Sequence, residues 1–304
     1  MTVTAYSFTR LSLRIATSAL AETVTAWYRA NARDLPWRQP GATPWGVLVS
    51  EVMLQQTQVS RVEPAWRRWM ERWPTPADLA ADPPGEAIRA WDRLGYPRRA
   101  LRLHACAGAI VERHDGEVPD DVDALLALPG IGMYTARAVA AFAFRQRHPV
   151  VDTNVRRVVA RVVEGAADGG AATTPADLRA VEVLLPVDHE AAATASVAFM
   201  ELGAVVCTAR TPRCDDCPLT AVCAWRLAGS PPSAAPSRRI QRYHGTDRYV
   251  RGLIMAVLRA ADDPVARDRL DAVWPDAEQR ERALGGLLAD GLVRERAGTF
   301  TLPG

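Results

Sequence analysis

A short run of proline and glycine, Pro129-Gly130-Ile131-Gly132, constrains the fold more than any other feature of this sequence. Residues 124–128 before it and 133–144 after it carry small and apolar side chains at helical spacing. A run so rich in proline and glycine does not continue a helix, so we predict a helix, a tight hairpin and a second helix. Gly130 and Gly132 would let successive backbone N–H groups converge at the start of the second helix. Such an arrangement binds an anion, for example a DNA phosphate.

A carboxylate follows this hairpin in the sequence VDTNVRRV. Asp152 stands directly before a predicted helix over residues 154–163, where the positive end of the helix dipole favours the ionised side chain. An aspartate at this position is most often an ordinary N-cap. Taken alone, Asp152 would therefore be interpreted as an ordinary cap.

Four cysteines lie within seventeen residues, with the spacing Cys-x6-Cys-x2-Cys-x5-Cys. Arg10 and Arg14 interrupt any apolar run near residue 1, so we expect a cytoplasmic protein with no membrane association. In that setting four close thiols indicate a metal site rather than disulfides. The spacing by itself does not choose between zinc and an iron–sulfur cluster. The four candidate ligands are Cys207, Cys214, Cys217 and Cys223.

The length and charge of the chain set wide bounds. A chain of 304 residues, 48% of them hydrophobic, can bury a full core and form two or three domains. The net charge of +2 is uninformative. Arginines cluster near the candidate segments, which supports nucleic-acid binding weakly because solvated helix faces give similar clusters.

The N-terminal third carries two further candidate segments. Residues 1–20 are predicted to form a mobile tail, and a helix over 21–30 leads into the loop RDLPWRQPGATPWG. There Arg33, Trp37 and Arg38 combine cations with an aromatic face, which suits a stacked base. Taken alone, this loop favours a tryptophan packed under its prolines. Residues 47–73 are predicted to form one helix, with Ser50 as its cap and Glu51 near its start.

Several motifs resemble the helix-hairpin-helix base-excision DNA glycosylases, and specifically the adenine DNA glycosylases of the MutY type. SEVMLQQTQV around Glu51 is similar to the adenine-specific branch almost letter for letter. LGY around Tyr96, LPGIG with Asp152 twenty residues after its last glycine, and ELGA before the four cysteines occur in the family's order. The resemblance covers roughly residues 21–226.

This resemblance implies a mainly α protein with the helix-hairpin-helix glycosylase fold: two helical subdomains and a loop that binds a [4Fe-4S] cluster through the four cysteines. In the family's chemistry Glu51 is the general acid that protonates the adenine, and Asp152 faces the sugar cation, assisted by Tyr134 and Asn154. The residues expected to contact the extruded base or enter the DNA stack are Arg33, Trp37, Arg38, Leu54, Gln55, Gln56, Thr57 and Tyr96.

The expected reaction is excision of adenine mispaired with 8-oxoguanine or guanine, on double-stranded DNA, by a monomer associated with the nucleoid. Tyr134 stands where the endonuclease III branch carries a lysine nucleophile, so a monofunctional enzyme without strand cleavage is expected. Three departures bear on recognition. Pro97 replaces a second aromatic, Val197 replaces a pocket Glu or Gln, and the 81 residues after Cys223 are too few for the Nudix-like domain of many relatives.

The C-terminal part is expected to be a separate module. Residues 21–228 would form the glycosylase domain, with the cluster loop at 207–223, and 229–247 a linker that begins GSPPSAAPS. Residues 248–304 show three helical patterns and a hairpin with Ala297-Gly298 at its turn, in the order of a winged-helix module. DNA binding through its third helix and a purely structural role both remain open.

Three alternatives stay open beside this reading. A glycosylase of the same fold for thymine or uracil opposite guanine is the nearest. A non-catalytic DNA-binding protein would not need Glu51, Tyr134 and Asp152 together. A zinc-stabilised transcription factor built on the C-terminal module is the most distant.

Overall fold

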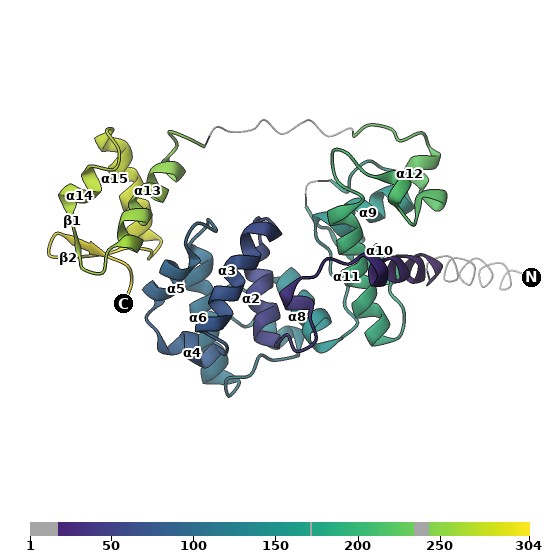
Figure 1. Ribbon diagram of the computed structural model, residues 1–304, viewed down its shortest axis with the longest axis horizontal. Coiled ribbons are helices and arrows are strands. Elements are labelled where there is room, and N and C mark those ends of the chain that lie inside the picture. Colours follow the sequence, from purple (N-terminus) through teal and green to yellow (C-terminus); the bar gives the residue numbers. More distant parts are fainter. Residues whose placement is uncertain (1–17, 171, 234–242) are drawn as a thin grey trace, which may run out of the picture. The chain divides into compact units, whose positions relative to one another are not determined.

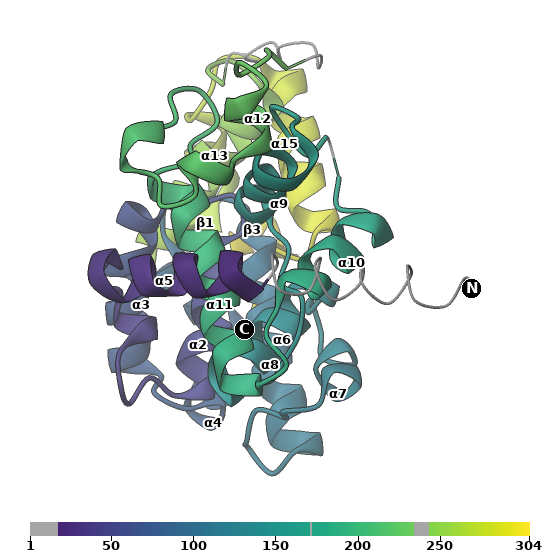
Figure 2. The same cartoon turned by 90° about the vertical axis from the view of Figure 1, so that its right-hand side faces the viewer.

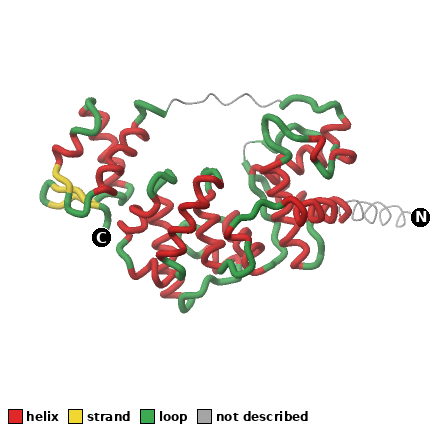
Figure 3. The backbone as a smooth tube through the Cα atoms, viewed as in Figure 1, coloured by secondary structure: helices red, strands yellow, loops and turns green. Residues whose placement is uncertain are grey.

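The computed structural model describes residues 18–170, 172–233 and 243–304. As expected of the fold class, these residues are mainly helical, and their three short strands all lie near the C-terminus (Figure 1, Figure 3). The predicted tail over residues 1–20 falls largely outside the described residues, although 18–20 begin a helix that runs to residue 31. None of the described helices is long and apolar enough to cross a membrane.

The chain divides into two compact units. The first comprises Met1–Val47, Asp120–Asp123 and Gly132–Ser237, and the second comprises Leu48–Pro119, Ala124–Ile131 and Arg238–Gly304. The helices α2 (Pro44–Leu54) and α7 (Val122–Leu126) each contribute residues to both. The domain boundaries expected from the sequence, at 228 and 247, stay a prediction.

The first unit is built around the packing of α9 against α11, which lie side by side (Figure 2). Helix α11 is apolar on nearly all sides and is buried, as such a helix must be. Val155, Val158, Phe199 and Leu202 form the centre of this core, each at most 2% exposed. The elements of the unit are the helix over 18–31, η1 (Pro36–Arg38), α8 (Met133–Phe144), α9 (Thr153–Val159), η2 (Ala160–Glu164), α10 (Pro175–Leu184), α11 (His189–Val205), η3 (Cys214–Asp216), η4 (Thr220–Val222) and α12 (Ala224–Leu227).

The predicted helix over residues 154–163 is present but changes type along its length. Helix α9 ends at Val159 and continues as the π-helical turn η2. Gly165, at φ 72°, ends the turn in the left-handed conformation that glycine adopts without strain.

The second unit contains a core of tryptophans. Trp69 contacts Trp73 and Trp91 edge to face, with ring centroids 4.6 Å and 5.7 Å apart. All three rings are almost fully buried. They come from the region of α3 (Val59–Arg72) and α5 (Pro84–Trp91), which lie beside α4 (Pro76–Ala81) and α6 (Arg98–Arg113).

The prediction of a single helix over residues 47–73 is wrong. The structure has two helices, α2 and α3, separated at residues 55–58, where Gln56 adopts φ 55°. Ser50 is fully buried inside α2 and does not cap it, and Glu51 lies well inside that helix rather than near its start. At the end of α2, Arg99, more than forty residues away, donates to the carbonyl oxygens of Val52 and Met53 at 3.0 Å each. Apolar periodicity carries no sign of such a contact.

The described residues 243–304 include the predicted module over 248–304, are called the C-terminal module from here on, and have the element order expected of a winged-helix module. Its helices are α13 (Asp247–Ala260), α14 (Arg267–Asp271) and α15 (Ala277–Ala289), and its strands are β1 (Val265–Ala266), β2 (Arg294–Arg296) and β3 (Thr299–Thr301). The strands form an antiparallel sheet in the order β1-β3-β2. The predicted turn at Ala297-Gly298 joins β2 to β3, with both residues at positive φ. Strand β1 was not predicted because two residues are too short to show alternation.

Candidate functional site

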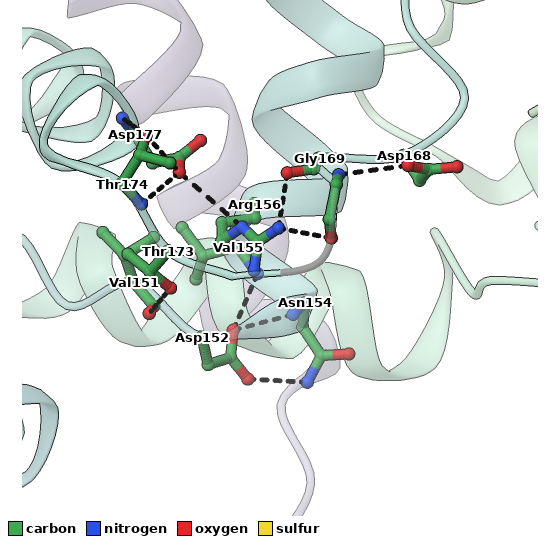
Figure 4. A network of polar contacts seen from close by, with 11 residues as sticks. Val151, Asp152, Asn154, Val155, Arg156, Asp168, Gly169, Thr173, Thr174 and Asp177 are labelled. Atoms are coloured by element: carbon green, nitrogen blue, oxygen red, sulfur yellow. Dashed lines mark hydrogen bonds and ion pairs between the residues drawn. The ribbon is translucent and has the colours of Figure 1, made fainter. Parts of the chain in front are cut away.

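Asp152 is the N-cap of α9, and both oxygens of its carboxylate accept hydrogen bonds (Figure 4). Oδ1 accepts hydrogen bonds from the backbone N–H groups of Asn154 at 2.9 Å and Val155 at 2.7 Å. Oδ2 accepts one from Asn154 Nδ2 at 2.8 Å. Burial raises the pKa of Asp152, and these three hydrogen bonds offset the rise only in part. The carboxylate is therefore fixed in one orientation, in an environment that raises its pKa.

Arg157, one turn further along α9, fixes the amide of Asn154 in turn. Its Nη2 donates to Asn154 Oδ1 at 2.8 Å and to the carbonyl oxygen of Gly203 at 2.7 Å, while Nε donates to that of Cys207 at 2.7 Å. With Oδ1 accepting from Arg157, the NH₂ group of Asn154 must face Asp152. A Cβ at Gly203 would lie 2.7 Å from the carbonyl oxygen of Asn154, so α9 and α11 approach this closely only because the residue is glycine.

A buried carboxylate on α11 holds the two arginines predicted to contact the base. Arg33 donates to Glu201 from Nε to Oε1 at 2.6 Å and from Nη2 to Oε2 at 2.8 Å. Arg38 donates from Nη1 to Oε2 at 2.8 Å. The Glu201 side chain is 0% exposed, whereas that of Arg33 is 36% exposed. Burial alone would raise the pKa of Glu201, but the two guanidinium groups outweigh it and lower the pKa to about 2.

Trp37 and Tyr134 lie in the same unit, and neither ring is exposed. Trp37 is 6% exposed in η1, which agrees with the packed arrangement considered beside stacking. Tyr134 is half-buried in the first turn of α8 and packs against Ala138, Ala141 and Val150. Gly132 is the N-cap of that helix.

The four predicted ligand cysteines line one pocket. Arg161 lies against them: its Nη1 donates to Cys207 Sγ at 3.3 Å, and its guanidinium stacks over Trp225 at 4.6 Å. Burial raises the pKa of the Cys217 thiol to about 11. Among the described residues, no three His, Cys, Asp or Glu side chains are arranged to hold a single metal ion. Four thiols around a common pocket with a buried guanidinium at one sulfur are a donor set that fits an iron–sulfur cluster.

The single cysteine outside this pocket behaves as expected of a small apolar side chain. Cys106 is 0% exposed in α6, and burial raises the pKa of its thiol to about 12.

In the second unit, Glu51 lies on α2 and is 5% exposed. The segment predicted to enter the DNA stack follows it: Leu54 is the last residue of α2, and Gln55 and Gln56 form the break before α3. Gln56 is exposed, whereas Thr57 is 9% exposed and its Oγ1 accepts from Arg99.

One buried guanidinium connects this segment to the turn that carries Tyr96. Arg99 Nη1 donates to the carbonyl oxygen of Gln55 at 2.6 Å, and Nη2 donates to that of Gly95 at 3.0 Å. Arg99 is 7% exposed, and burial lowers its pKa to about 10. Tyr96 itself is 43% exposed and adopts φ 50°. Its ring is therefore accessible, on a turn whose backbone is hydrogen-bonded to Arg99.

At position 130 of the predicted hairpin, both the backbone conformation and the lack of room for a side chain require glycine. It adopts φ 79°, and a Cβ at this position would lie 2.7 Å from Cβ of Arg102. Any other residue would push the hairpin away from α6.

The structure thus brings together Asp152, Asn154 and the cysteine loop in the first unit, and the Leu54–Thr57 segment and Tyr96 in the second. Glu51 and Asp152 belong to different units, so their joint action on one nucleotide stays a prediction. Sequence reasoning did not find Glu201, Arg99 or Arg157. Glu201 left one signal, a lone carboxylate within the apolar run ASVAFMELGAVV, which indicates a buried ion pair.

Two family models match the chain. Residues 49–179 match the model of the HhH-GPD superfamily base excision DNA repair protein. Residues 207–223 match the iron–sulfur binding domain of endonuclease III, which contains all four pocket cysteines.

The chain is also similar to individual proteins. It is 59% identical over 281 residues to the adenine DNA glycosylase of Mycobacterium tuberculosis, covering 92% of each chain. The solved structure of a thermostable thymine-DNA glycosylase matches 70% of this chain and 97% of its own, with a TM-score of 0.62 and 25% identity. A trapped endonuclease III–DNA covalent intermediate matches 71% of this chain and 98% of its own, with a TM-score of 0.60 and 23% identity.

Proposed function

The chain belongs to the adenine DNA glycosylases of the HhH-GPD superfamily, and we propose that it releases adenine mispaired with 8-oxoguanine or guanine without cutting the DNA strand. It is therefore a base excision repair enzyme whose substrate is DNA. The observation that best supports the proposed chemistry is the Asp152 carboxylate, held by three hydrogen bonds at the start of α9. A negative group oriented in this way suits a reaction that develops positive charge on a sugar.

The first step proposed is protonation of the base by Glu51. Adenine is a poor leaving group, so a proton on N7 must accompany cleavage of the bond between N9 and C1′, whose electron pair departs with the base. Glu51 is 5% exposed on α2. A buried carboxyl group suits delivery of a proton to the base, and after the base departs Glu51 would accept a proton from the attacking water.

Asp152 is proposed to stabilise the oxocarbenium-like sugar that remains, by charge or by a transient bond to C1′. Asn154 holds the carboxylate in place, and Tyr134 is assigned to the same task by its position in the motif. Two carboxyl groups in different environments then take different roles, as in other glycosidic cleavages.

The absence of an amine at position 134 is the basis for proposing a monofunctional enzyme. Strand scission by this fold needs a primary amine that forms a Schiff base with the sugar, and Tyr134 cannot supply one. The product expected is an abasic site in an intact strand.

The cysteine loop is an iron–sulfur binding domain, and Cys207, Cys214, Cys217 and Cys223 would hold the [4Fe-4S] cluster. When bound, the cluster cross-links the loop covalently. The loop packs on the core of the first unit through Leu219 and Cys223, and the carbonyl oxygen of Cys207 accepts from Arg157 of α9. A loop cross-linked by the cluster would therefore help to fix the orientation of α9.

The proposed partner is double-stranded DNA with a mismatched adenine, engaged by a monomer at the nucleoid in the cytoplasm. Gly130 and Gly132 would bind a phosphate through backbone N–H groups, and Leu54, Gln55, Gln56, Thr57 and Tyr96 would enter the stack beside the extruded base. Trp37, Arg33 and Arg38 would border the base.

Single-turnover base release tests this function. Duplexes would carry A opposite 8-oxoguanine, A opposite G, A opposite C, and T or U opposite G, with alkali added afterwards to reveal abasic sites. We expect adenine release with scission only after alkali. Release of T or U would favour the second candidate, for which the structural similarity to a thymine-DNA glycosylase is the specific observation.

A further inference from the structure

The C-terminal module is held against helices α5 and α6 of its own unit. The backbone N–H of Gly85 donates to the carbonyl oxygen of Pro303 at 2.6 Å, and Arg98 Nη1 lies 3.1 Å from Asp290 Oδ1. A Cβ at Gly85 would lie 2.5 Å from the same Pro303 oxygen, so the end of the chain passes too close for any side chain there. The module is therefore docked on the helices that flank the Tyr96 turn.

From this docked position the module reaches Tyr96 itself. Arg248, in the first turn of α13, places its guanidinium carbon 4.5 Å from the centroid of the Tyr96 ring, and Arg99 places its own 5.6 Å away. Two guanidinium groups thus contact the Tyr96 ring. Arg99 comes from α6, and Arg248 comes from the C-terminal module. Arg248 is exposed and Tyr96 is 43% exposed.

The contact is better suited to orienting the ring than to stabilising the fold. Gly95 at φ 83° and Tyr96 at φ 50° place the ring on a left-handed turn, where a tyrosine side chain has several staggered positions available. A guanidinium over the ring face favours one of them through attraction to the ring's negative face. At an exposed site this attraction is too weak to be needed for folding.

The third helix of the module gives less reason to assign it a DNA-binding role. Its arginines face carboxylates of the same module: Arg280 lies 3.3 Å from Asp271, and Arg282 lies 3.4 Å from Asp247. Arg248, by contrast, contacts Tyr96, which lies outside the module.

We propose that Arg248 is a positioning residue for the Tyr96 ring, and that the C-terminal module thereby takes part in unstacking the target base. The proposal rests on the proposed function, because it takes Tyr96 to be the aromatic wedge. A wedge that is already oriented before DNA arrives does not lose side-chain freedom on insertion, so insertion costs less free energy. Arg248 acts through Tyr96 and touches no reacting atom.

The first test compares Arg248→Met, which keeps an unbranched apolar stem and removes the charge, with Arg248→Lys. With A opposite 8-oxoguanine, we expect Arg248→Met to lower the single-turnover rate about fivefold, or about 1 kcal/mol at about 1.4 kcal/mol per factor of ten. Arg248→Lys keeps a cation over the ring and should stay within about twofold of the wild type. The melting temperature of Arg248→Met should equal that of the wild type. The slope of log binding constant against log salt concentration, measured with undamaged DNA, should also be unchanged. If Arg248 instead contacted a phosphate, its loss would reduce this slope by about one.

The second test asks whether Arg248 acts through the ring. In a Tyr96→Ala background, Arg248→Met should have no further effect, because the ring that it positions is gone. The same loss in both backgrounds would overturn the proposal, as would a rate for Arg248→Met equal to or above that of the wild type. Arg296→Met removes an exposed arginine from β2 of the same module and serves as the charge control. An equal loss with this control would assign the effect to charge alone and would also overturn the proposal.

A fluorescent base separates this inference from the proposed function. 2-Aminopurine placed next to the target adenine reports unstacking on binding, whether or not a base is released. If the wild type releases no adenine, the proposed function fails, but a fluorescence rise with the wild type that is smaller with Arg248→Met still supports positioning. Equal rises with the two proteins would contradict it.

Discussion

The side-chain amide of Asn154 is bonded on both sides, donating to Asp152 Oδ2 at 2.8 Å and accepting from Arg157 Nη2 at 2.8 Å. Because Arg157 can only donate, this arrangement fixes which end of the amide faces Asp152. Arg157 therefore fixes the orientation of the Asn154 amide, and Asn154 in turn fixes the carboxylate of Asp152.

Replacing Asn154 by alanine should shift the pH dependence of base release. The pKa of Asp152 is raised by burial, and the Asn154 hydrogen bonds act against that rise. If the ionised carboxylate is the reactive form, activity is lost as pH falls through this pKa. Removing the amide raises the pKa further, so the acid limb of the single-turnover rate should move to higher pH. Thr153→Ala, a change at the exposed neighbour, should leave the limb in place, and an unmoved limb in Asn154→Ala would contradict the assignment.

Asp152→Asn and Glu51→Gln should each abolish base release while DNA binding survives. An asparagine still caps a helix, so α9 should remain folded in the first variant. Loss of either carboxyl group should lower the single-turnover rate by about a hundredfold or more, the contribution typical of a positioned acid or base. Binding to a duplex with a non-hydrolysable adenosine analogue provides the control. Activity near the wild-type level in either variant would remove that residue from the mechanism.

Cys217→Ser should lose the iron–sulfur cluster, whereas Cys106→Ala should keep it. Cys217 lines the pocket with the other three ligand cysteines, and serine is a poor ligand for such a cluster. Cys106 is buried among apolar residues of α6, away from any of these sulfurs in sequence. Iron content and visible absorption of the purified proteins measure the outcome. A wild-type protein that contains zinc and no iron would refute the cluster.

Local signals predicted much of the fold. Helix α8 begins and ends at Met133 and Phe144, where the sequence places it, because proline and glycine precede its small apolar residues. The turn at Ala297-Gly298 was found for the same reason. Asp152 was correctly placed before a helix because N-capping depends on residues two or three positions away.

Contacts between distant residues account for what was missed. Arg99 contacts the end of α2 from more than forty residues away, and the contact of Tyr96 with Arg248 joins segments about 150 residues apart. Hydrophobic periodicity reports only which face of a helix is buried, and carries no information about a guanidinium arriving from elsewhere. The paired carboxylate Glu201 was missed because its partners lie 163 and 168 residues earlier.

Glu201 should make the stability of the protein depend on pH in an acidic window. Its pKa in the folded protein is about 2, below the ordinary value of 4.5, because Arg33 and Arg38 outweigh the effect of burial. Between these pH values the unfolded state binds more protons than the folded state, so stability falls as pH falls. The contribution is fully present above pH 4.5 and is lost as pH approaches about 2. Its size is at most about 3 kcal/mol.

Urea unfolding of the wild type and Glu201→Gln at several pH values measures this contribution. The glutamine variant should be less stable at neutral pH, because Arg33 and Arg38 lose their charged partner, and the difference between the two proteins should shrink as pH falls from 4.5 towards 2. Glu63→Gln, at an ion pair on the surface of α3, is the matched control and should change stability by about 0.5 kcal/mol or less. A difference that stays constant across the window would show that Glu201 stabilises the protein by packing rather than by charge.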